Sequence, residues 1–194
     1  MFMAQKLRMN TFLPEGYEIP ESAGGYYLKF KPGTTQVRIL RSPVVGFELW
    51  SDVVDEDGKK TRKSVRKKST SEFTPQDGDK SKARHFWAMP VWNYKEGRVQ
   101  IWTLTQKGIM KSIRDLCDDA EWGSPINYDL KVTRRGESKN DTEYQIMPSV
   151  PKPIDADVQK LIDETPVDMQ RFMLGEDPFD AFSDDNLNPD DIDF

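Results

Sequence analysis

Residues 85–104 read HFWAMPVWNYKEGRVQIWTL, and this stretch decides the fold. Two runs of β-branched and aromatic residues flank Lys95-Glu96-Gly97, and a three-residue connection that contains glycine predicts a β-hairpin. Side chains alternate between the two faces of a strand, which puts Phe86, Trp92 and Tyr94 together on one face. The other face is apolar as well. One face therefore packs in the core, and the second needs a cover, either another layer of protein or a bound ligand.

Further strands and one helix are expected around this hairpin. A stripe of apolar residues at helical spacing predicts an amphipathic helix over 106–120, with Thr105 as its N-cap. Short strands with one helix before the last two predict a mainly β fold, an OB-type five-stranded barrel, with a β-sandwich as the alternative. The expected additional strands lie at 26–30, 36–41, 44–50, 128–134 and 143–147.

The composition divides the chain into four parts. Residues 1–24 form an irregular N-terminal arm, 25–154 form the OB-type core, 155–175 form a short helical segment that docks on the core, and 176–194 form a disordered acidic tail. Within the core, residues 59–84 are highly charged and poor in apolar side chains. A long flexible basic loop is expected there, because little apolar burial offsets the entropy lost on ordering.

The charge changes sign along the chain. Residues 1–154 hold 26 of the 28 Lys and Arg and 20 of the 33 Asp and Glu, a formal charge of +6. Residues 155–194 hold 2 basic and 13 acidic residues, a formal charge of −11. From Glu176 onward there are eight carboxylates and no cation. A basic body with an acidic end predicts a body that binds a polyanion and a tail that imitates one.

The composition also excludes several classes of protein. No apolar run approaches the roughly 18 residues that cross a bilayer, and the N-terminus lacks the apolar region of a signal peptide. No membrane partner is therefore expected, and the expected location is the cytoplasm, or the cytoplasm of an infected host. One cysteine, Cys117, and one histidine, His85, provide neither an intrachain disulfide nor a four-ligand zinc site. No metal or other cofactor is expected.

Catalytic signatures are weak. The sequence contains no Walker loop and no glycine-rich dinucleotide fingerprint, and His85 has no matched nucleophile. The acidic residues Asp52, Asp55, Glu56 and Asp57 have the oxygen ligands of a Mg²⁺-dependent nuclease site. They lie on a turn-like segment without a strand-borne partner, so solvated loop charges are the preferred interpretation. The protein is not expected to be an enzyme.

Basic and aromatic side chains together predict nucleic-acid binding. Lys and Arg that neutralise phosphates release counterions, which supplies most sequence-independent affinity, although a charge run is also compatible with a solvated loop. Aromatic side chains that stack on bases contribute about 1–3 kcal/mol each, and Phe86, Trp92, Tyr94 and Trp102 are the expected platform. The cations expected to contact DNA are Arg38, Arg41, Lys59, Lys60, Arg62, Lys63, Arg66, Lys67, Lys68, Lys80, Lys82 and Arg84.

The end of the tail is expected to bind partner proteins. The last residues, Asp190, Asp191, Ile192, Asp193 and Phe194, combine carboxylates with a terminal aromatic ring, which suits an apolar pocket with a basic rim. A tethered polyanion also reaches a cationic groove on its own chain at high effective concentration. The tail is therefore expected to compete with nucleic acid for that groove; a purely solubilising tail is the alternative.

Three regions of the chain resemble the single-stranded DNA-binding proteins of tailed bacteriophages. They are GYYLKFKPG at 25–33 leading into VRIL at 37–40, the aromatic hairpin at 86–102 followed by the helix, and the acidic, Phe-terminated PDDIDF at 189–194. The resemblance implies an OB fold and a role in DNA replication, recombination and repair. It also implies contacts of the tail with phage or host replication and recombination proteins.

The leading hypothesis is thus a sequence-tolerant protein that binds single-stranded DNA. Two alternatives remain open: a replication or recombination accessory protein that works through protein–protein contacts, and a metal-dependent nuclease that uses residues 52–57. The sequence leaves open whether the protein is a monomer or a dimer.

Overall fold

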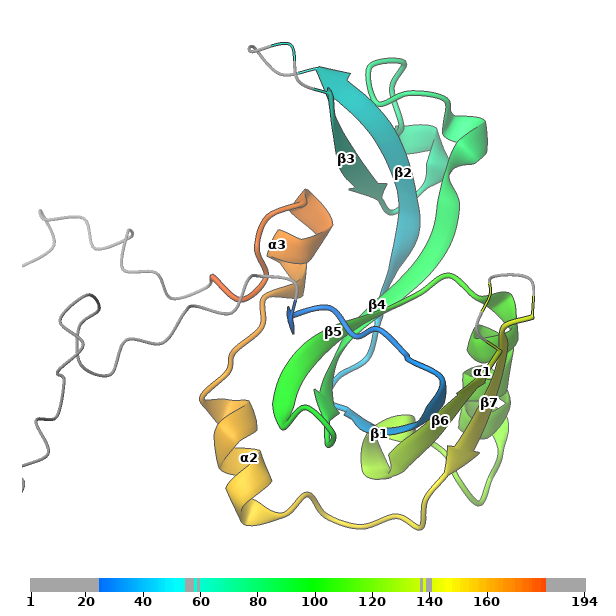
Figure 1. Ribbon diagram of the computed structural model, residues 1–194, viewed down its shortest axis with the longest axis vertical. Helices are drawn as coiled ribbons and strands as arrows, with labels where there is room; N and C mark the ends of the chain where they lie inside the picture. The colour runs from blue at the N-terminus through cyan, green and yellow to red at the C-terminus, as the bar shows by residue number, and fades with distance from the viewer. Residues whose placement is uncertain (1–24, 55–57, 59, 137, 139–140, 181–194) are drawn as a thin grey trace, which may run out of the picture.

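The protein is mainly β, with an open antiparallel sheet of seven strands and few helices (Figure 1). A computed structural model describes residues 25–54, 58, 60–136, 138 and 141–180. The predicted hairpin is confirmed as β4 and β5. The strands are β1 (Gly33–Ile39), β2 (Val44–Val54), β3 (Lys60–Lys67), β4 (Arg84–Asn93), β5 (Arg98–Leu104), β6 (Asp129–Arg135) and β7 (Glu143–Pro148).

The sheet does not close into a barrel. Its strand order is β3-β2-β4-β1-β6-β7, and β5 pairs with the other edge of β4. Among the described residues no pairing joins β5 to β7 or β3 to β7, so the predicted closed five-stranded barrel is wrong. The free edge of β5 is met by the segment predicted as a strand at 26–30. That segment forms only an isolated bridge, between Tyr27 and Ile101.

Strand β4 organises the sheet because β1 and β2 share one of its edges. Residues 44–48 of β2 pair with 88–84, and 37–39 of β1 pair with 93–91. Between these two strands the chain passes through Pro43, which has no N–H to donate to a ladder. Strand β2 then continues to Val54, beyond the start of β4 at Arg84.

The predicted basic loop at 59–84 is largely a strand and two short turns. Residues 60–67 form β3, which pairs with β2 along its whole length, so the loop prediction is wrong for this stretch. The β2–β3 hairpin projects beyond the rest of the sheet (Figure 1). The remainder contains the 3-10 turns Thr70–Glu72 and Lys80–Lys82 and the buried Phe73. It contacts the hairpin where the Ser51 hydroxyl donates to the Asp77 carbonyl. Pairing with β2 satisfies the backbone N–H and C=O groups of this basic segment and so holds it as a strand.

One apolar core lies between the sheet and helix α1 (Lys107–Asp118). The helix predicted at 106–120 is confirmed, and Ile109, Met110 and Ile113 are its buried face. Its N-cap residue is Gln106, with no side-chain capping bond, so the prediction of Thr105 as the cap is wrong. The 3-10 turn Pro125–Asn127 connects the helix region to β6.

A second apolar core covers the opposite face of the β4–β5 hairpin. Helix α2 (Ala156–Asp163) and helix α3 (Met169–Leu174) lie on this side of the molecule, away from α1 (Figure 1). Val167, Met169 and Phe172 pack here against Phe86 and Trp92. The short helical segment predicted at 155–175 therefore docks on the core, and a second layer of protein covers the second face of the hairpin.

The first residues of the predicted acidic tail are ordered against the core. The Asp168 N–H donates to the Pro178 carbonyl at 2.8 Å, and the Phe179 ring stacks on Tyr26 with centroids 4.3 Å apart. The prediction of disorder is thus wrong for residues 176–180. Residues 181–194, with the expected partner-binding residues Asp190 to Phe194, lie outside the described residues, as does the arm 1–24.

Candidate nucleic-acid interface

Arg38, expected to contact DNA, is a buried structural residue. It is 2% exposed, and its Nε donates to Asp129 Oδ1 at 2.6 Å. Its other nitrogens donate to the Ile126 carbonyl at 3.3 Å and the Lys152 carbonyl at 2.9 Å. A cation with these partners is not accessible to phosphates, so the expectation for Arg38 is wrong.

The expected aromatic platform is also inside the protein. Phe86 and Trp92 belong to the core beneath α3, and Trp102 belongs to the core beneath α1. Tyr94 is half-buried, and its hydroxyl donates to Asp129 Oδ1 at 3.0 Å. Burial, with the nearby Asp129 carboxylate, raises the pKa of Tyr94 to about 12. The expectation that Phe86, Trp92 and Trp102 stack on bases is wrong because 167–172 cover one face of the hairpin and α1 covers the other. For the half-buried Tyr94 it stays a prediction.

Two further cations from the expected set bond to other parts of the protein, although Arg41 itself is exposed. Arg41 donates to the Val167 carbonyl at 2.6 Å. Arg66 forms an ion pair with Glu48, Nη2 to Oε1 at 3.0 Å, in which both side chains are about 10% exposed. Arg66 therefore does not face solvent as a phosphate ligand would.

The remaining basic residues are divided between the two faces of the β2–β3 hairpin. Residues that face each other across the pair share a face, so Arg62 and Lys60 lie on the side of Trp50, whereas Lys63 and Lys67 lie on the other side. Lys80, Lys82 and Arg84 are exposed at or just before the start of β4, and Lys68 is exposed after β3. Lys59 lies outside the described residues.

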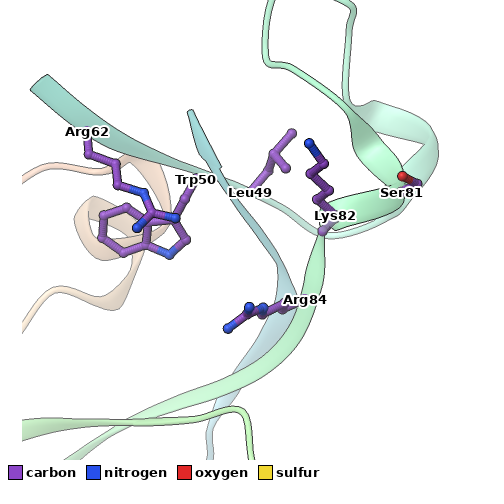
Figure 2. Close-up of a pocket in the computed structure, with 7 residues that line it drawn as sticks. Leu49, Trp50, Arg62, Ser81, Lys82 and Arg84 are labelled. Carbon is purple, nitrogen blue, oxygen red and sulfur yellow. The ribbon is translucent and has the colours of Figure 1, made fainter. Parts of the chain in front are cut away.

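A groove of about 590 Å³ opens where β2 continues past the start of β4. Three cations line it: Arg62 on β3, Lys82 on the 3-10 turn and Arg84 on β4. The other lining residues are Leu49, Trp50, Ser81 and Ala83. Figure 2 shows Trp50 and Arg62 on one side of this space and Lys82, Ser81 and Arg84 on the other. One edge of β2 pairs with β3, and the other pairs with β4 only as far as Glu48, because β4 begins at Arg84. The groove opens along this second edge, beside Trp50.

Trp50 is held in place yet remains accessible. It is 47% exposed, and its Nε1–H donates to Glu48 Oε2 at 2.8 Å. The Arg62 guanidinium carbon lies 5.5 Å from the centroid of the indole ring, within the range of a cation–π contact. An anchored aromatic ring beside three cations is the combination that stacks a base and neutralises its phosphates.

The loop that carries Lys82 is held by side-chain to backbone hydrogen bonds. Asp79 caps the Lys80–Lys82 turn by accepting from the Ser81 N–H at 3.0 Å and from the Ser81 hydroxyl at 2.7 Å. These hydrogen bonds hold the pKa of Asp79 below its ordinary value. Lys82 Nζ lies 3.9 Å from Asp79 Oδ2, an exposed pair of the kind that contributes little to stability.

Tyr27 lies beside α3 and near the ion pair of Glu48 and Arg66. Its ring centroid lies 6.4 Å from that of Phe172 on α3. Burial raises the pKa of the Tyr27 hydroxyl, the Arg66 guanidinium opposes the rise, and the carboxylates of Asp177 and Glu48 add to it. The carboxylates of Asp177, after α3, and of Glu48, on β2, therefore both act on this one hydroxyl.

Trp50 was not among the residues predicted from the sequence. It ends the strand expected at 44–50, next to an acidic turn, and no local signal separates it from a core tryptophan. The alternation of β2 places it on the same face as Glu48, which offers one indication that this face is polar. Its exposure depends on where β4 begins, and the residues around Trp50 do not specify that position.

Comparisons with protein families, curated proteins and solved structures found no match for this chain. Within the described ranges, no helix is long and apolar enough to cross a membrane. The same ranges contain no group of three or more His, Cys, Asp or Glu side chains that could hold a metal ion. Asp55, Glu56 and Asp57, considered for magnesium, lie outside them.

Proposed function

We propose that this protein binds single-stranded DNA without strong sequence preference, in replication, recombination and repair of phage DNA. The observation that carries the proposal is the groove with Trp50 exposed beside Arg62, Lys82 and Arg84. Trp50 would stack on one base, and the three cations would follow the adjacent phosphates. Every base has a π-face, so this mode of binding tolerates any sequence.

The position of the groove relative to the sheet supports the same proposal. Strands β1 and β2 together correspond to one long bent strand along β4, followed by β4, β5, α1, β6 and β7. A helix before the last two of five such strands is the OB-type order, and we retain an opened OB-type sheet as part of the proposal. In OB folds the excursion between the first two strands contacts oligonucleotides, and the β2–β3 hairpin lies in that excursion.

The acidic tail would act on this groove and on partner proteins. A Cβ placed on Gly175 would lie 3.7 Å from the Ser64 carbonyl, and Ser64 faces Trp50 across the hairpin. The chain thus leaves α3 beside the proposed DNA site, immediately before the run of carboxylates. We extend the proposal to a tail that competes with DNA for the groove and, when displaced, recruits replication or recombination proteins.

The test measures binding of fluorescein-labelled oligo-dT by fluorescence anisotropy. Trp50→Ala should weaken binding by roughly 5- to 150-fold, the effect of losing one stacked base, whereas Trp50→Phe should retain most of the affinity. The double variant Arg62→Ala/Arg84→Ala should weaken binding and reduce the slope of log K against log salt by roughly 1.4, the value for two lost contacts to single-stranded phosphates.

The matched control is Lys111→Ala/Arg114→Ala on α1, which removes the same charge outside the groove. It should change affinity by less than the groove double variant. Equal losses from both pairs would mean that binding follows net charge alone, and the proposed site would be wrong. Wild-type protein that does not bind oligo-dT at low salt would favour the alternative of an accessory protein that contacts acidic partners.

A further inference from the structure

Glu48 is a buried carboxylate on the hairpin that holds two side chains at once. Its Oε1 accepts from Arg66 Nε at 3.0 Å, and its Oε2 accepts from Trp50 Nε1 at 2.8 Å. Glu48 is paired with Arg66 on β3 and with Arg84 on β4, so a cation lies on either side of it. Hydrogen bonds with one ionised partner are about twice as strong as neutral ones, which suits this group to fixing an indole.

Arg66 extends this contact to helix α3. Its Nη1 donates to the Phe172 carbonyl at 2.8 Å, and its guanidinium carbon lies 4.0 Å from the centroid of the Phe172 ring. Phe172 is fully buried and packs on Phe86 with ring centroids 6.1 Å apart. All three guanidinium nitrogens of Arg66 therefore face a partner, two at Glu48 and one at the last turn of α3.

The contacts form one chain from the exposed Trp50, through Glu48 and Arg66, to α3. If α3 leaves the sheet, Arg66 loses both a carbonyl and an aromatic ring, and a largely buried guanidinium without those partners is expected to rehydrate by turning outward. Glu48 then loses the cation that keeps its carboxylate oriented toward Trp50. The orientation of the indole thus depends on a helix about 120 residues away in sequence.

We propose that Glu48 and Arg66 are positioning residues through which the docking of α3 sets the orientation of Trp50, so that the C-terminal segment regulates the groove. The inference rests on the proposed function for its effect on DNA, but not for its effect on Trp50. Regulation of this kind acts on the geometry of the site, and it is separate from charge competition by the tail.

The first measurement uses the free protein. Full-length chain labelled with 5-fluorotryptophan gives ¹⁹F NMR signals for its five tryptophans, and Trp50→Phe identifies the signal of Trp50. Arg66→Gln should shift this signal and increase its solvent-isotope shift, because the indole loses its fixed hydrogen bond. Lys67→Gln is the matched control: it removes the same charge from the next residue, on the opposite face of β3, and should leave the signal in place.

A second variant perturbs α3 at a distance from Trp50. Asp168 accepts from the Gln170 and Arg171 N–H groups and so caps α3. Asp168→Ala should loosen the helix and move the Trp50 signal in the same direction as Arg66→Gln. Unchanged signals of Trp87, Trp102 and Trp122, which belong to the core beneath α1, would show that the fold is intact. If Arg66→Gln fails to fold, Arg66→Lys replaces it, since lysine keeps the charge without the forked geometry.

The DNA measurement follows on the same proteins. Arg66→Gln should weaken oligo-dT binding by roughly tenfold more than Lys67→Gln, part of the stacking contribution of one base. A Trp50 signal that does not move in Arg66→Gln or Asp168→Ala would overturn the inference. A signal that moves in both, in a protein that does not bind oligo-dT, would leave the positioning role standing and reject the proposed function.

Discussion

Arg38 lies in a buried polar cluster that joins β1 to β6. Asp129 is fully buried and accepts from Arg38 Nε at 2.6 Å, Gln36 Nε2 at 2.8 Å and the Tyr94 hydroxyl at 3.0 Å. A carboxylate at this depth is tolerated only with such a set of donors. The cluster therefore ties together two strands and the end of β4, and its residues act on stability.

Arg38→Ala should lower the free energy of unfolding by about 3–5 kcal/mol, because Asp129 is left as an uncompensated buried charge. Urea denaturation followed by tryptophan fluorescence measures this loss. Arg135→Ala, on an exposed position of the neighbouring strand β6, serves as the control and should change stability by less than about 0.5 kcal/mol. Folded Arg38→Ala should retain oligo-dT binding; a large loss of affinity with unchanged stability would contradict the structural role.

At the scale of elements, the β2–β3 hairpin depends on a close approach at its base. A Cβ on Gly46 would lie 2.6 Å from the Lys67 carbonyl and 3.3 Å from Met173 Cε on α3. Glycine is required here by space, since the end of β3 and the helix both pass over this position. Gly108, in the first turn of α1, has no neighbour within 4 Å of such a Cβ.

Gly46→Ala should destabilise the protein by about 1–3 kcal/mol, because the Lys67 backbone has to move away from the hairpin base. Gly108→Ala should instead stabilise it by about 0.5–1 kcal/mol, since alanine reduces the entropy of the unfolded chain without a clash. Thermal unfolding monitored by circular dichroism compares the two. Gly46→Ala with wild-type stability would show that the hairpin base is looser than the structure has it.

At the scale of the whole molecule, the segregation of charge is the dominant property. The acidic segment begins beside the proposed groove, where Arg171 pairs with Glu176 at 3.4 Å and Asp180 at 3.4 Å. These first carboxylates are therefore partly neutralised by α3 itself. The other five carboxylates of this segment lie between Asp184 and Asp193, a stretch of sequence that contains no Lys or Arg.

A chain that ends at Asp180 should bind oligo-dT more tightly than the full-length protein, by roughly three- to tenfold at low salt, because the tethered competitor is removed. The difference should shrink as salt rises, since the Debye length falls from about 10 Å at 0.1 M to about 3 Å at 1 M. Ending the chain at Asp180 keeps the docked contacts of Pro178 and Phe179. Full-length protein with these five Asp changed to Asn should behave like the shortened chain; equal affinities of all three would reject competition.

The strong local patterns of the sequence predicted the elements well. The β4–β5 hairpin, α1 and the docking segment at 155–175 follow from periodicity and turn residues, which act over a few positions. The apolar character of both hairpin faces also indicated that a cover exists. Strand β3 was missed because its residues are basic, and its β conformation depends on pairing with β2.

The sequence by itself determined the mainly β class, the hairpin, the helix and the separation of charge, because each is a property of neighbouring residues. Only the tertiary structure decided which aromatic and basic side chains remain available. Phe86 and Trp92 are buried in one core with Phe172. Arg38 and Arg66 bond to residues 91 and 106 positions away, Asp129 and Phe172. Trp50 is exposed because β4 begins at Arg84 and leaves the second edge of β2 open beside it. Burial and pairing are decided by residues distant in sequence, so no local pattern distinguishes a core tryptophan from one that is free to bind.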